Sequence, residues 1–385
     1  MFIASITCAV LALCGAGYYA ACLIASLRFL SEPKPEGTHT PPVTILKPVK
    51  GADAESEACF RSHFELEYPQ YQIVFGVAEQ NDLAIPIIEK LRREFPKIDS
   101  QMVICEQQLG ANRKVSNLAQ MLLAAKHEHL VINDADMLVR PEYLREVTAP
   151  FANEKMGFVT SIYRALPGKT IWLKVEALGI CTEFMPAVLL ARMIEGRVNF
   201  GLGATLACTR KALAAMGGFE SLLNRLADDY DLGTWIKRAG FETALSHYVA
   251  ETHAPDYDLH HFWNHQIRWN RTVRDARPAG YAGLIFTFGI FWSLLAMLLS
   301  HGAIWSSLLF ALVLGMRYLM AIGAGGIALG DQFLTRDLWL LPLRDAMSIV
   351  VWAASYFGRT VVWRGERFLL KKGTITAAWN QNKES

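Results

Sequence analysis

Hydrophobic residues are concentrated in two parts of the chain. No charged residue occurs from Ile3 to Leu27, and Arg317 is the only Asp, Glu, Lys or Arg between Pro278 and Gly330. A helix of about 20 apolar residues crosses a bilayer. The pattern therefore predicts an integral membrane protein. We divide it into an N-terminal transmembrane anchor, a globular domain, and a C-terminal transmembrane or re-entrant region with a basic tail, at residues 1–30, 31–277 and 278–385.

The first apolar segment is interpreted as an uncleaved anchor rather than a secretory signal peptide. A signal peptide begins with basic residues and has an apolar core of about 7–15 residues. Here the basic residues Arg28 and Lys34 follow the segment instead. Because positive charge accumulates on the cytoplasmic side, we expect the N-terminus outside and the globular domain in the cytoplasm.

The second apolar zone predicts two spans, at about 281–299 and 304–327, joined by a short turn. A third stretch, 338–357, is interrupted by Pro342, Arg344 and Asp345. Charges at membrane depth are costly and usually face protein or water. The tail at 358–372 carries five basic residues and one acidic residue, which favours the cytoplasm. We therefore predict that the third stretch is re-entrant or interfacial.

The globular part shows β-rich runs that alternate with helical patterns. The expected strands are 43–46, 71–77, 102–104 and 130–132, and the expected helices are 55–66, 83–95 and 113–127. This alternation predicts an α/β fold with a mostly parallel sheet and helices on both faces. Ligands of such sheets bind beyond the carboxyl ends of the strands. Neither G-x-G-x-x-G nor a P-loop lysine motif is present in the sequence, so dinucleotide and ATP binding are not supported.

Composition narrows the class of protein. The chain is 52% hydrophobic and 19% charged, whereas a soluble domain carries about 25% charged residues. A net charge of +2 does not suggest a nucleic-acid binder. The seven cysteines include no C-x-x-C pair, so they are interpreted as apolar core residues rather than metal ligands.

Carboxylates follow two of the expected strands. Asp134 and Asp136 come directly after the strand at 130–132 and are suited to hold a divalent cation, which would hold a diphosphate. The alternative is a turn residue followed by a helix cap. Asp82 follows the strand at 71–77 and suits a uracil or ribose contact, or equally a helix N-cap.

Two further groups carry candidate chemistry. The acidic run Ala227–Asp231 precedes an expected helix. It either supplies a general base with a raised pKa or consists of first-turn acids that the helix dipole stabilises. Arg268 could pair with a phosphate, and Trp269 could stack on a sugar or lipid. His265 lies four residues after His261, but no third metal ligand is evident, so a surface or interfacial role is preferred. The helix at 170–193 is either a lipid-side wall or an ordinary core helix.

Together these residues resemble the D, D, D, (Q/R)-x-x-R-W signature of membrane glycosyltransferases with a GT-A fold. The likeness is greatest to the ceramide glucosyltransferases of glycosyltransferase family 21 and their bacterial, hopanoid-associated relatives. The supporting segments are Leu46-Lys-Pro-Val-Lys-Gly51, Phe64-Glu-Leu-Glu-Tyr-Pro69, Asn112-Arg-Lys-Val-Ser-Asn-Leu118, Ala227-Asp-Asp-Tyr230 and Ile267-Arg-Trp269.

The resemblance implies a role for each matching residue. Asp229 would be the catalytic base, and Asp82, Lys114 and Asp134 would bind the nucleotide sugar. Asp134 and Asp136 would hold Mg²⁺ or Mn²⁺. Arg268, Trp269 and His265 would form the acceptor and diphosphate site. His265 departs from the Gln or Arg of the family pattern, whereas the D-x-D pair is complete and points to the bacterial branch.

The implied activity is an inverting transfer of a sugar from UDP-glucose or UDP-N-acetylglucosamine to a lipid hydroxyl, of ceramide or a hopanoid. The expected partners are the donor, the lipid acceptor and the bilayer, without nucleic acid or an obligate protein partner. The implied location is the bacterial inner membrane, with the catalytic domain in the cytoplasm. The alternatives are a processive polysaccharide synthase and an inactive nucleotide-sugar-binding membrane protein.

Overall fold

The computed structural model describes residues 2–34, 38–253, 256, 258–363 and 365–377. Arg364, one of the basic residues of the predicted tail, and residues 378–385 lie outside this set. The chain forms two compact units. We call them the α/β unit, made of residues 33–166, 196–255 and 368–385, and the helical unit, made of residues 1–32, 167–195 and 256–367.

The α/β unit contains an eight-stranded mixed sheet in the order β3-β2-β1-β4-β7-β6-β8-β5. Its strands are β1 Val43–Val49, β2 Tyr71–Val77, β3 Asp99–Ile104, β4 His129–Asn133, β5 Met137–Leu138, β6 Met156–Ala165, β7 Thr205–Thr209 and β8 Glu242–Thr252. The first four strands are parallel, as the alternating pattern predicts. β7 is antiparallel to both β4 and β6, which makes the sheet mixed.

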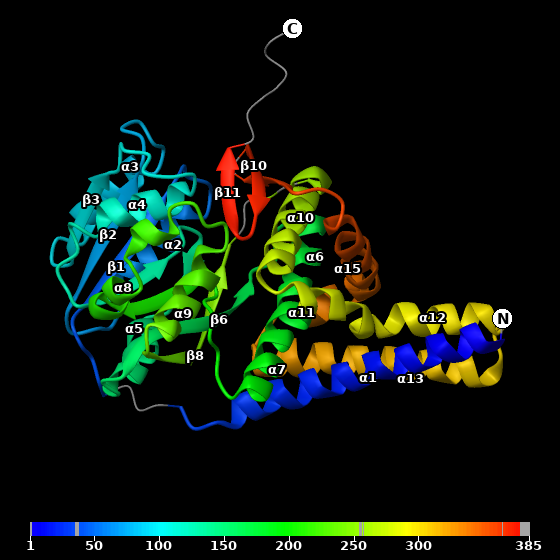
Figure 1. Ribbon diagram of the computed structural model, residues 1–385. Helices are drawn as coiled ribbons and strands as arrows, with labels where there is room; N and C mark the ends of the chain where they lie inside the picture. Colours follow the sequence, from blue (N-terminus) through cyan, green and yellow to red (C-terminus); the bar gives the residue numbers. More distant parts are fainter. Residues whose placement is uncertain (1, 35–37, 254–255, 257, 364, 378–385) are drawn as a thin grey trace, which may run out of the picture. The chain divides into compact units, whose positions relative to one another are not determined.

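Helices cover both faces of this sheet, as predicted (Figure 1). They are α2 Ser56–Phe64, α3 Ile85–Glu94, α4 Arg113–Met121, α5 Tyr143–Thr148, η1 Ala149–Ala152, α8 Arg210–Ala215, η3 Phe219–Leu222 and α9 Asp228–Arg238. Neighbouring residues of a strand point to opposite faces. On β2, Phe75 contacts the rings of Phe60 and Phe64 from α2, whereas a Cβ on Gly76 would lie 2.2 Å from the sulfur of Met121 on α4.

Two helix boundaries differ from the sequence expectation. α4 ends at Met121 rather than at 127. The chain continues in tighter turns, with bonds from Leu123 N to Gln120 O and from Ala124 N to Met121 O. α9 begins at Asp228, so the acidic run forms its first turn instead of preceding it. Negative charge in a first turn is stabilised by the helix dipole.

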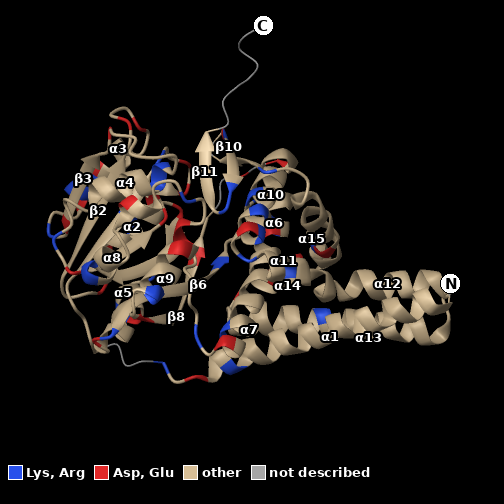
Figure 2. Ribbon diagram, viewed as in Figure 1, with Lys and Arg blue, Asp and Glu red and all other residues tan. Residues whose placement is uncertain are grey.

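The helical unit contains the apolar segments. Its elements are α1 Phe2–Ser31, α6 Ile171–Gly179, the π-helix η2 Ile180–Phe184, α7 Met185–Glu195, α10 Leu259–Ala276, α11 Pro278–Gly283, η4 Leu284–Thr287, α12 Gly289–Leu299, α13 Ile304–Met320, the π-helix η5 Ala321–Ala328, α14 Leu334–Asp337, η6 Leu338–Leu340, α15 Leu341–Ser355 and strand β9 Thr360–Trp363. Helices α1, α12 and α13 run side by side (Figure 1). Figure 2 shows that charged residues are almost absent along them.

Four helices of the described chain are long and apolar enough to cross a membrane, namely 2–31, 171–195, 304–328 and 334–355. The expected span at 281–299 lies within a pair of helices, 278–287 and 289–299, that is bent by 47° and forms either one broken span or a re-entrant loop. The stretch expected at 338–357 is continuously helical from 338 to 355, because Pro342 lies in the first turn of α15, where its missing N–H costs no hydrogen bond. A Cβ on Gly15 would lie 2.4 Å from Gly289 Cα, so α1 and α12 approach at backbone distance.

Candidate active site

The carboxylates of the D-x-D pair lie at the carboxyl end of β4. This strand is paired on both sides, with β1 and β7, and the chain turns immediately after Asn133. The turn is fixed by two backbone hydrogen bonds, from Met137 N to Asp134 O (3.3 Å) and from His253 N to Asp136 O (2.9 Å). The Thr252 hydroxyl donates to Asp136 Oδ2 (3.0 Å). The side chain of Asp134 is 37% exposed.

Lys114 links the D-x-D pair to the acidic turn of α9. The side chain of Asn112 caps α4 by accepting from Val115 N (3.1 Å), which places Lys114 in the first turn. Its Nζ lies 2.6 Å from Asp134 Oδ1 and 3.7 Å from Asp228 Oδ2. Burial alone would lower the pKa of Lys114, but these carboxylates outweigh it and raise the pKa. Lys114 is therefore a fixed positive charge between two carboxylates.

Asp229 is the carboxylate best suited to accept a proton. Burial, and next the neighbouring Asp228, raise its pKa to about 7. A base works best when its pKa is near the operating pH. Asp228 is buried, accepts a hydrogen bond from Asn112 Nδ2 (3.1 Å), and has a pKa raised mainly by burial. Sequence reasoning had not assigned a role to Asp228, although it lies within the quoted acidic segment.

Gly203 lies between the two groups of carboxylates. A Cβ at this position would be 3.1 Å from Asp229 Oδ2 and 3.7 Å from Asp134 Oδ2. Asp134 and Asp229 thus both lie beside the space at Gly203. Only a residue without a side chain leaves this space open, and no sequence signal had indicated Gly203.

The residues at this point fit a divalent cation. Burial, and next the charge of Asp134, raise the pKa of Asp136, so the two carboxylates repel each other and a cation would relieve the repulsion. The described residues contain no group of three or more His, Cys, Asp or Glu placed to hold a metal. Mg²⁺ is commonly bound by only one or two carboxylates together with substrate phosphates and waters. Asp134 and Asp136 match that donor set.

A buried lysine lies beneath the D-x-D turn. Lys47 on β1 is fully buried and donates to Asn133 Oδ1 (2.9 Å) and to the backbone oxygen of Asp134 (2.8 Å). His63 also contacts Asn133 Oδ1, at 2.8 Å. Burial lowers the pKa of Lys47 to about 8. The signal for Lys47 was the Lys-Pro dipeptide inside a strand, since a buried lysine is rare unless it is paired.

Asp82 makes local contacts. Both of its carboxylate oxygens accept from Gly51 N (2.9 and 3.0 Å), and Oδ1 also accepts from Ala84 N (2.8 Å). It therefore joins the loops after β1 and β2 and supports the turn into α3, close to the alternative helix-cap interpretation. Its contact with a nucleotide stays a prediction.

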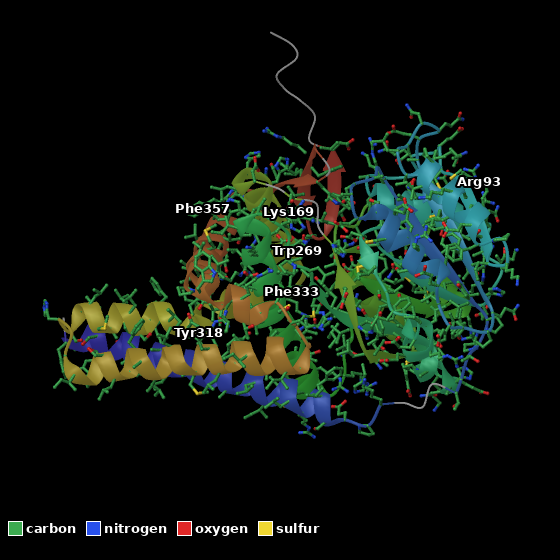
Figure 3. All side chains as sticks on the ribbon, turned by 180° about the vertical axis from the view of Figure 1, so that it is seen from behind. Arg93, Lys169, Trp269, Tyr318, Phe333 and Phe357 are labelled. Atoms are coloured by element: carbon green, nitrogen blue, oxygen red, sulfur yellow. The ribbon has the colours of Figure 1, made fainter. Side chains whose placement is uncertain are left out.

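His265, Arg268 and Trp269 lie in the helical unit, on α10; Trp269 is labelled in Figure 3. His265 Nδ1 is 3.0 Å from Glu176 Oε2, and its ring lies 4.5 Å from that of Trp269. The Arg268 guanidinium lies 5.9 Å from the Trp363 ring. Their proposed part in binding the acceptor and the diphosphate stays a prediction. The side chain of Glu176, which sequence reasoning had missed, holds the histidine.

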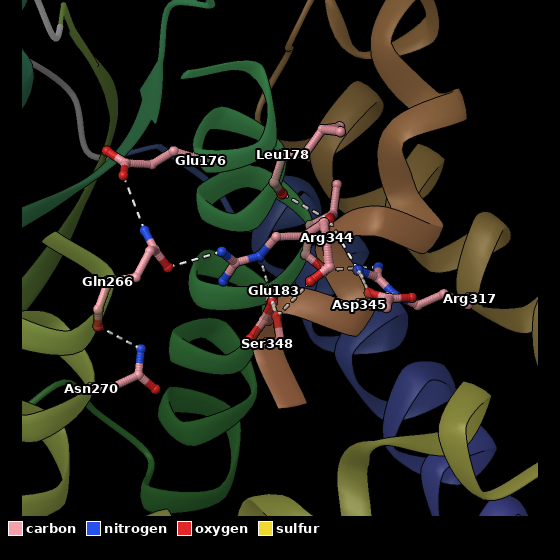
Figure 4. Close-up of polar contacts among 10 residues, drawn as sticks. Glu176, Leu178, Glu183, Gln266, Asn270, Arg317, Arg344, Asp345 and Ser348 are labelled. Atoms are coloured by element: carbon pink, nitrogen blue, oxygen red, sulfur yellow. Dashed lines mark hydrogen bonds and ion pairs between the residues drawn. The ribbon is translucent and has the colours of Figure 1, made fainter. Parts of the chain in front are cut away.

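Polar side chains continue from α10 into the apolar helices (Figure 4). Gln266 donates to Glu176 Oε2 (3.0 Å) and accepts from Arg344 Nη1 (2.9 Å). Arg344 Nε donates to Glu183 Oε2 (3.0 Å), which also accepts from the Ser348 hydroxyl (2.7 Å). The charge that the sequence places at membrane depth is thus paired. This chain of hydrogen bonds connects α6, η2, α10 and α15.

The mixed sheet, with the acidic turn after β4, has the GT-A fold. A mannosyltransferase from Pyrobaculum calidifontis, solved in complex with GDP-Man and Mn²⁺, superimposes with a TM-score of 0.54 at 19% identity, over 91% of this chain and 99% of that chain. This likeness establishes the fold.

The sequence model of glycosyltransferase family 21 matches residues 7–376, and the chain belongs to this family. It is 24% identical to ceramide glucosyltransferase 1 of Caenorhabditis elegans over 376 residues, which are 94% of this chain and 78% of that protein. It is also 37% identical to a ceramide glucosyltransferase of Komagataella phaffii over 101 residues, which are 25% of this chain and 20% of that protein. The chain is a hexosyltransferase, as the resemblance in its motifs implied.

Proposed function

We propose that the chain is a membrane-bound inverting glycosyltransferase. It would transfer a sugar from UDP-glucose or UDP-N-acetylglucosamine to the hydroxyl of a membrane lipid, ceramide or a hopanoid. The observation that carries the proposal is the approach of both Asp229 and Asp134 to Gly203 in a chain of family 21. The named activity of the ceramide glucosyltransferase relatives supports a lipid acceptor.

In the proposed reaction, Asp229 removes the proton of the acceptor hydroxyl while that oxygen attacks the anomeric carbon. The bond from this carbon to the diphosphate breaks, and its electron pair leaves with UDP. Lys114 lies beside Asp134 and Asp228. Its ammonium would therefore be close to a diphosphate held at Asp134 and would bind a phosphate oxygen. Asp134 and Asp136 would hold a Mg²⁺ or Mn²⁺ ion, whose charge would neutralise the leaving diphosphate. A single displacement inverts the anomeric centre and gives a β-linked product from an α-linked donor.

Membranes that contain the chain test this proposal. Each labelled donor is offered with ceramide and with a hydroxylated hopanoid, in the presence of Mg²⁺ or Mn²⁺. We expect one labelled lipid, and a loss of about 10²-fold or more in D229N and D136N. The control is D99N. Asp99 lies on the edge strand β3 and forms an exposed ion pair with Lys126.

The other outcomes identify the alternatives. A long insoluble product would indicate a processive synthase. UDP binding without a labelled product from any donor and acceptor would indicate an inactive nucleotide-sugar binder.

We also propose three membrane crossings, with the tail on the same side as the catalytic unit. Residues 33–166, 196–255 and 368–385 belong to one folded unit, which lies on one side of a membrane. The chain leaves this unit before the helix at 171–195 and returns to it afterwards. A single crossing by this helix would place the two parts of the unit on opposite sides of the membrane. We therefore propose that it does not cross, although its length and composition would allow it.

The same parity applies between residues 255 and 368. Three candidate spans lie there, and an even number of crossings is required. α15 is the one that we place at the interface, because its segment has a mean hydropathy of 1.2, against 1.8 for the segment of α13, and carries Arg344 and Asp345. α1, the bent pair ending in α12, and α13 are then the three crossings, with the N-terminus outside.

Protease protection of terminal epitope tags tests this arrangement in sealed right-side-out vesicles. We expect the N-terminal tag to be removed and the C-terminal tag to be protected. Removal of the C-terminal tag from sealed vesicles would contradict the proposal. Lysed vesicles, in which both tags are removed, are the control.

A further inference from the structure

The segment that follows the last apolar helix returns to the α/β unit as a β-hairpin. Its strands are β10 Glu366–Lys371 and β11 Thr374–Ala377, with Phe368 opposite Ala377 and Lys371 opposite Thr374. The two turn residues, Lys372 and Gly373, have positive φ angles of 50° and 75°. Positive φ at both positions is the requirement of the tight type I′ hairpin turn, so this turn has a defined shape.

The hairpin turn is bonded to the loop that precedes the catalytic acids. Leu226 N donates to Gly373 O (3.1 Å), and Ile375 N donates to Asn224 O (2.8 Å). Between these two bonds, Arg225 Nη1 donates to Lys372 O (2.8 Å) and to the Thr374 hydroxyl (3.3 Å). The hairpin and the loop therefore pair as strands do, on both sides of Arg225.

Arg225 also holds the first turn of α9. Its Nε donates to Asp231 Oδ2 at 2.5 Å, and the Asp231 side chain is only 8% exposed. A Cβ on Gly373 would lie 2.0 Å from Arg225 Nη2. Gly373 is thus required both for its backbone conformation and for the space that the guanidinium occupies.

The opposite side of the loop is bonded to the start of α4. Asn112 N donates to Leu223 O (2.8 Å), and Asn112 Nδ2 donates to Arg225 O (2.8 Å). The same Nδ2 group also donates to Asp228 Oδ1 (3.1 Å). The loop is held between the helix that carries Lys114 and the hairpin, and Asp228 and Asp229 follow it directly.

We infer that the C-terminal hairpin is a clamp that positions the catalytic acids, with Arg225 and Gly373 as positioning residues. The inference rests on the proposed function, because it gives Asp229 the role of base. Arg225 touches neither donor nor acceptor in this proposal. It fixes the start of α9, and hence where Asp229 lies relative to Asp134. Chain that lies beyond every apolar helix thereby completes the active site.

The test compares full-length G373A, R225A and R225K, and a chain ending at Arg367, with the unaltered protein in detergent. T376A is the matched control, because Thr376 is an exposed hairpin residue. Three quantities are measured: steady-state transfer, the stoichiometry of UDP binding with Mn²⁺, and hydrogen exchange of a peptide that covers 223–231.

We expect kcat to fall about 10- to 100-fold in G373A, R225A and the shortened chain, because a displacement near 1 Å has an effect of that size. KM for the donor should stay within about threefold, UDP stoichiometry should stay unchanged, and exchange at 223–231 should increase. R225K should lie between R225A and the unaltered protein, because one ammonium cannot replace the fork of the guanidinium. T376A should change none of these.

Two results would overturn the clamp. One is unchanged exchange, or unchanged kcat, in G373A and the shortened chain. The other is UDP stoichiometry that falls in proportion to kcat, since the hairpin would then support only the fold. If the unaltered protein transfers no sugar, the proposed function fails, and with it the catalytic role of the clamp. Exchange at 223–231 then decides only whether the hairpin holds the loop: faster exchange supports this and unchanged exchange rejects it.

Discussion

The ammonium of Lys114 lies 2.6 Å from Asp134 Oδ1, so one carboxylate of the D-x-D pair already has a cationic partner within the protein. A divalent cation that binds at Asp134 must share this carboxylate with Lys114. A diphosphate would resolve the competition, because it offers Lys114 another anion. The site is therefore arranged to take the cation and the nucleotide together.

The K114M variant separates these two effects. Without the ammonium, no cation of the protein competes for Asp134, so Mn²⁺ alone should bind more tightly, by about tenfold. UDP should bind more weakly, because one phosphate contact is lost. Calorimetric titration with Mn²⁺ and with UDP–Mn²⁺ measures both. K126M, which removes an exposed lysine paired at 2.6 Å with Asp99, should change neither, and a parallel loss of both affinities in K114M would contradict the competition.

The pH dependence of kcat/KM should report Asp229. A protonated carboxyl cannot accept a proton, and the pKa of Asp229 is raised to about 7, so the rate should rise with pH through that value. Asp228 is the second largest cause of this rise. Removing its charge in D228N favours the ionised form of Asp229 and lowers the pKa. The acidic limb of the profile should therefore move to lower pH, and a limb that stays in place or moves to higher pH would exclude Asp229 as the titrating base.

A methyl group on Gly203 should block the space between the carboxylates. In G203A the new Cβ would lie 3.1 Å from Asp229 Oδ2, which requires Asp229 to shift. We expect kcat to fall about 10- to 100-fold, with a small change in melting temperature. G17A is the control, because a Cβ at Gly17 has no heavy atom of another element within 4 Å. Full activity in G203A would show that the space is not used.

Lys47 should support both the fold and the site. K47M keeps the length of the side chain but removes a donor of the backbone oxygen of Asp134 and one of the two contacts of Asn133 Oδ1, which keeps its contact with His63. An unsatisfied buried polar group costs about 1–3 kcal/mol, so the melting temperature should fall. The affinity for Mn²⁺ with UDP should fall as well, because the turn that bears Asp134 loosens. K90M, at an exposed lysine of α3 paired with Glu57, is the control, and unchanged thermal stability in K47M would refute this role.

The pair of Arg317 and Asp345 should be stabilising only as a pair. Arg317 is 2% exposed and donates to both oxygens of Asp345, at 2.7–3.1 Å, and to the backbone oxygen of Thr182 in η2, at 3.0 Å. Removing one partner of a buried pair costs about 3–5 kcal/mol. R317M and D345L should each lower thermal stability in detergent, and the double variant should recover much of the loss. Additive losses in the double variant would show that the two charges act independently.

Local patterns in the sequence determined much of the fold. The parallel strands β1 to β4 and the helices between them follow from the alternation of apolar and polar residues, because period 2 and period 3.6 are properties of the local backbone. In the same way, the apolar segments predicted helices that are long and apolar enough to cross a membrane. The D-x-D pair could be predicted as part of a binding site because a polar turn after a buried strand lies at the carboxyl end of that strand, where ligands of parallel sheets bind.

The tertiary structure decided which of these residues meet. Lys114 reaches Asp134, Asp229 and Asp134 both approach Gly203, and the hairpin at Gly373 holds Arg225. Each contact joins segments that are distant in the chain. β7 lies between β4 and β6 and is antiparallel to both. No pattern in the sequence of β7 predicts this position in the sheet. The sequence thus determined the elements and the chemistry that they carry, whereas the arrangement of the charges depends on long-range packing, which no local period encodes.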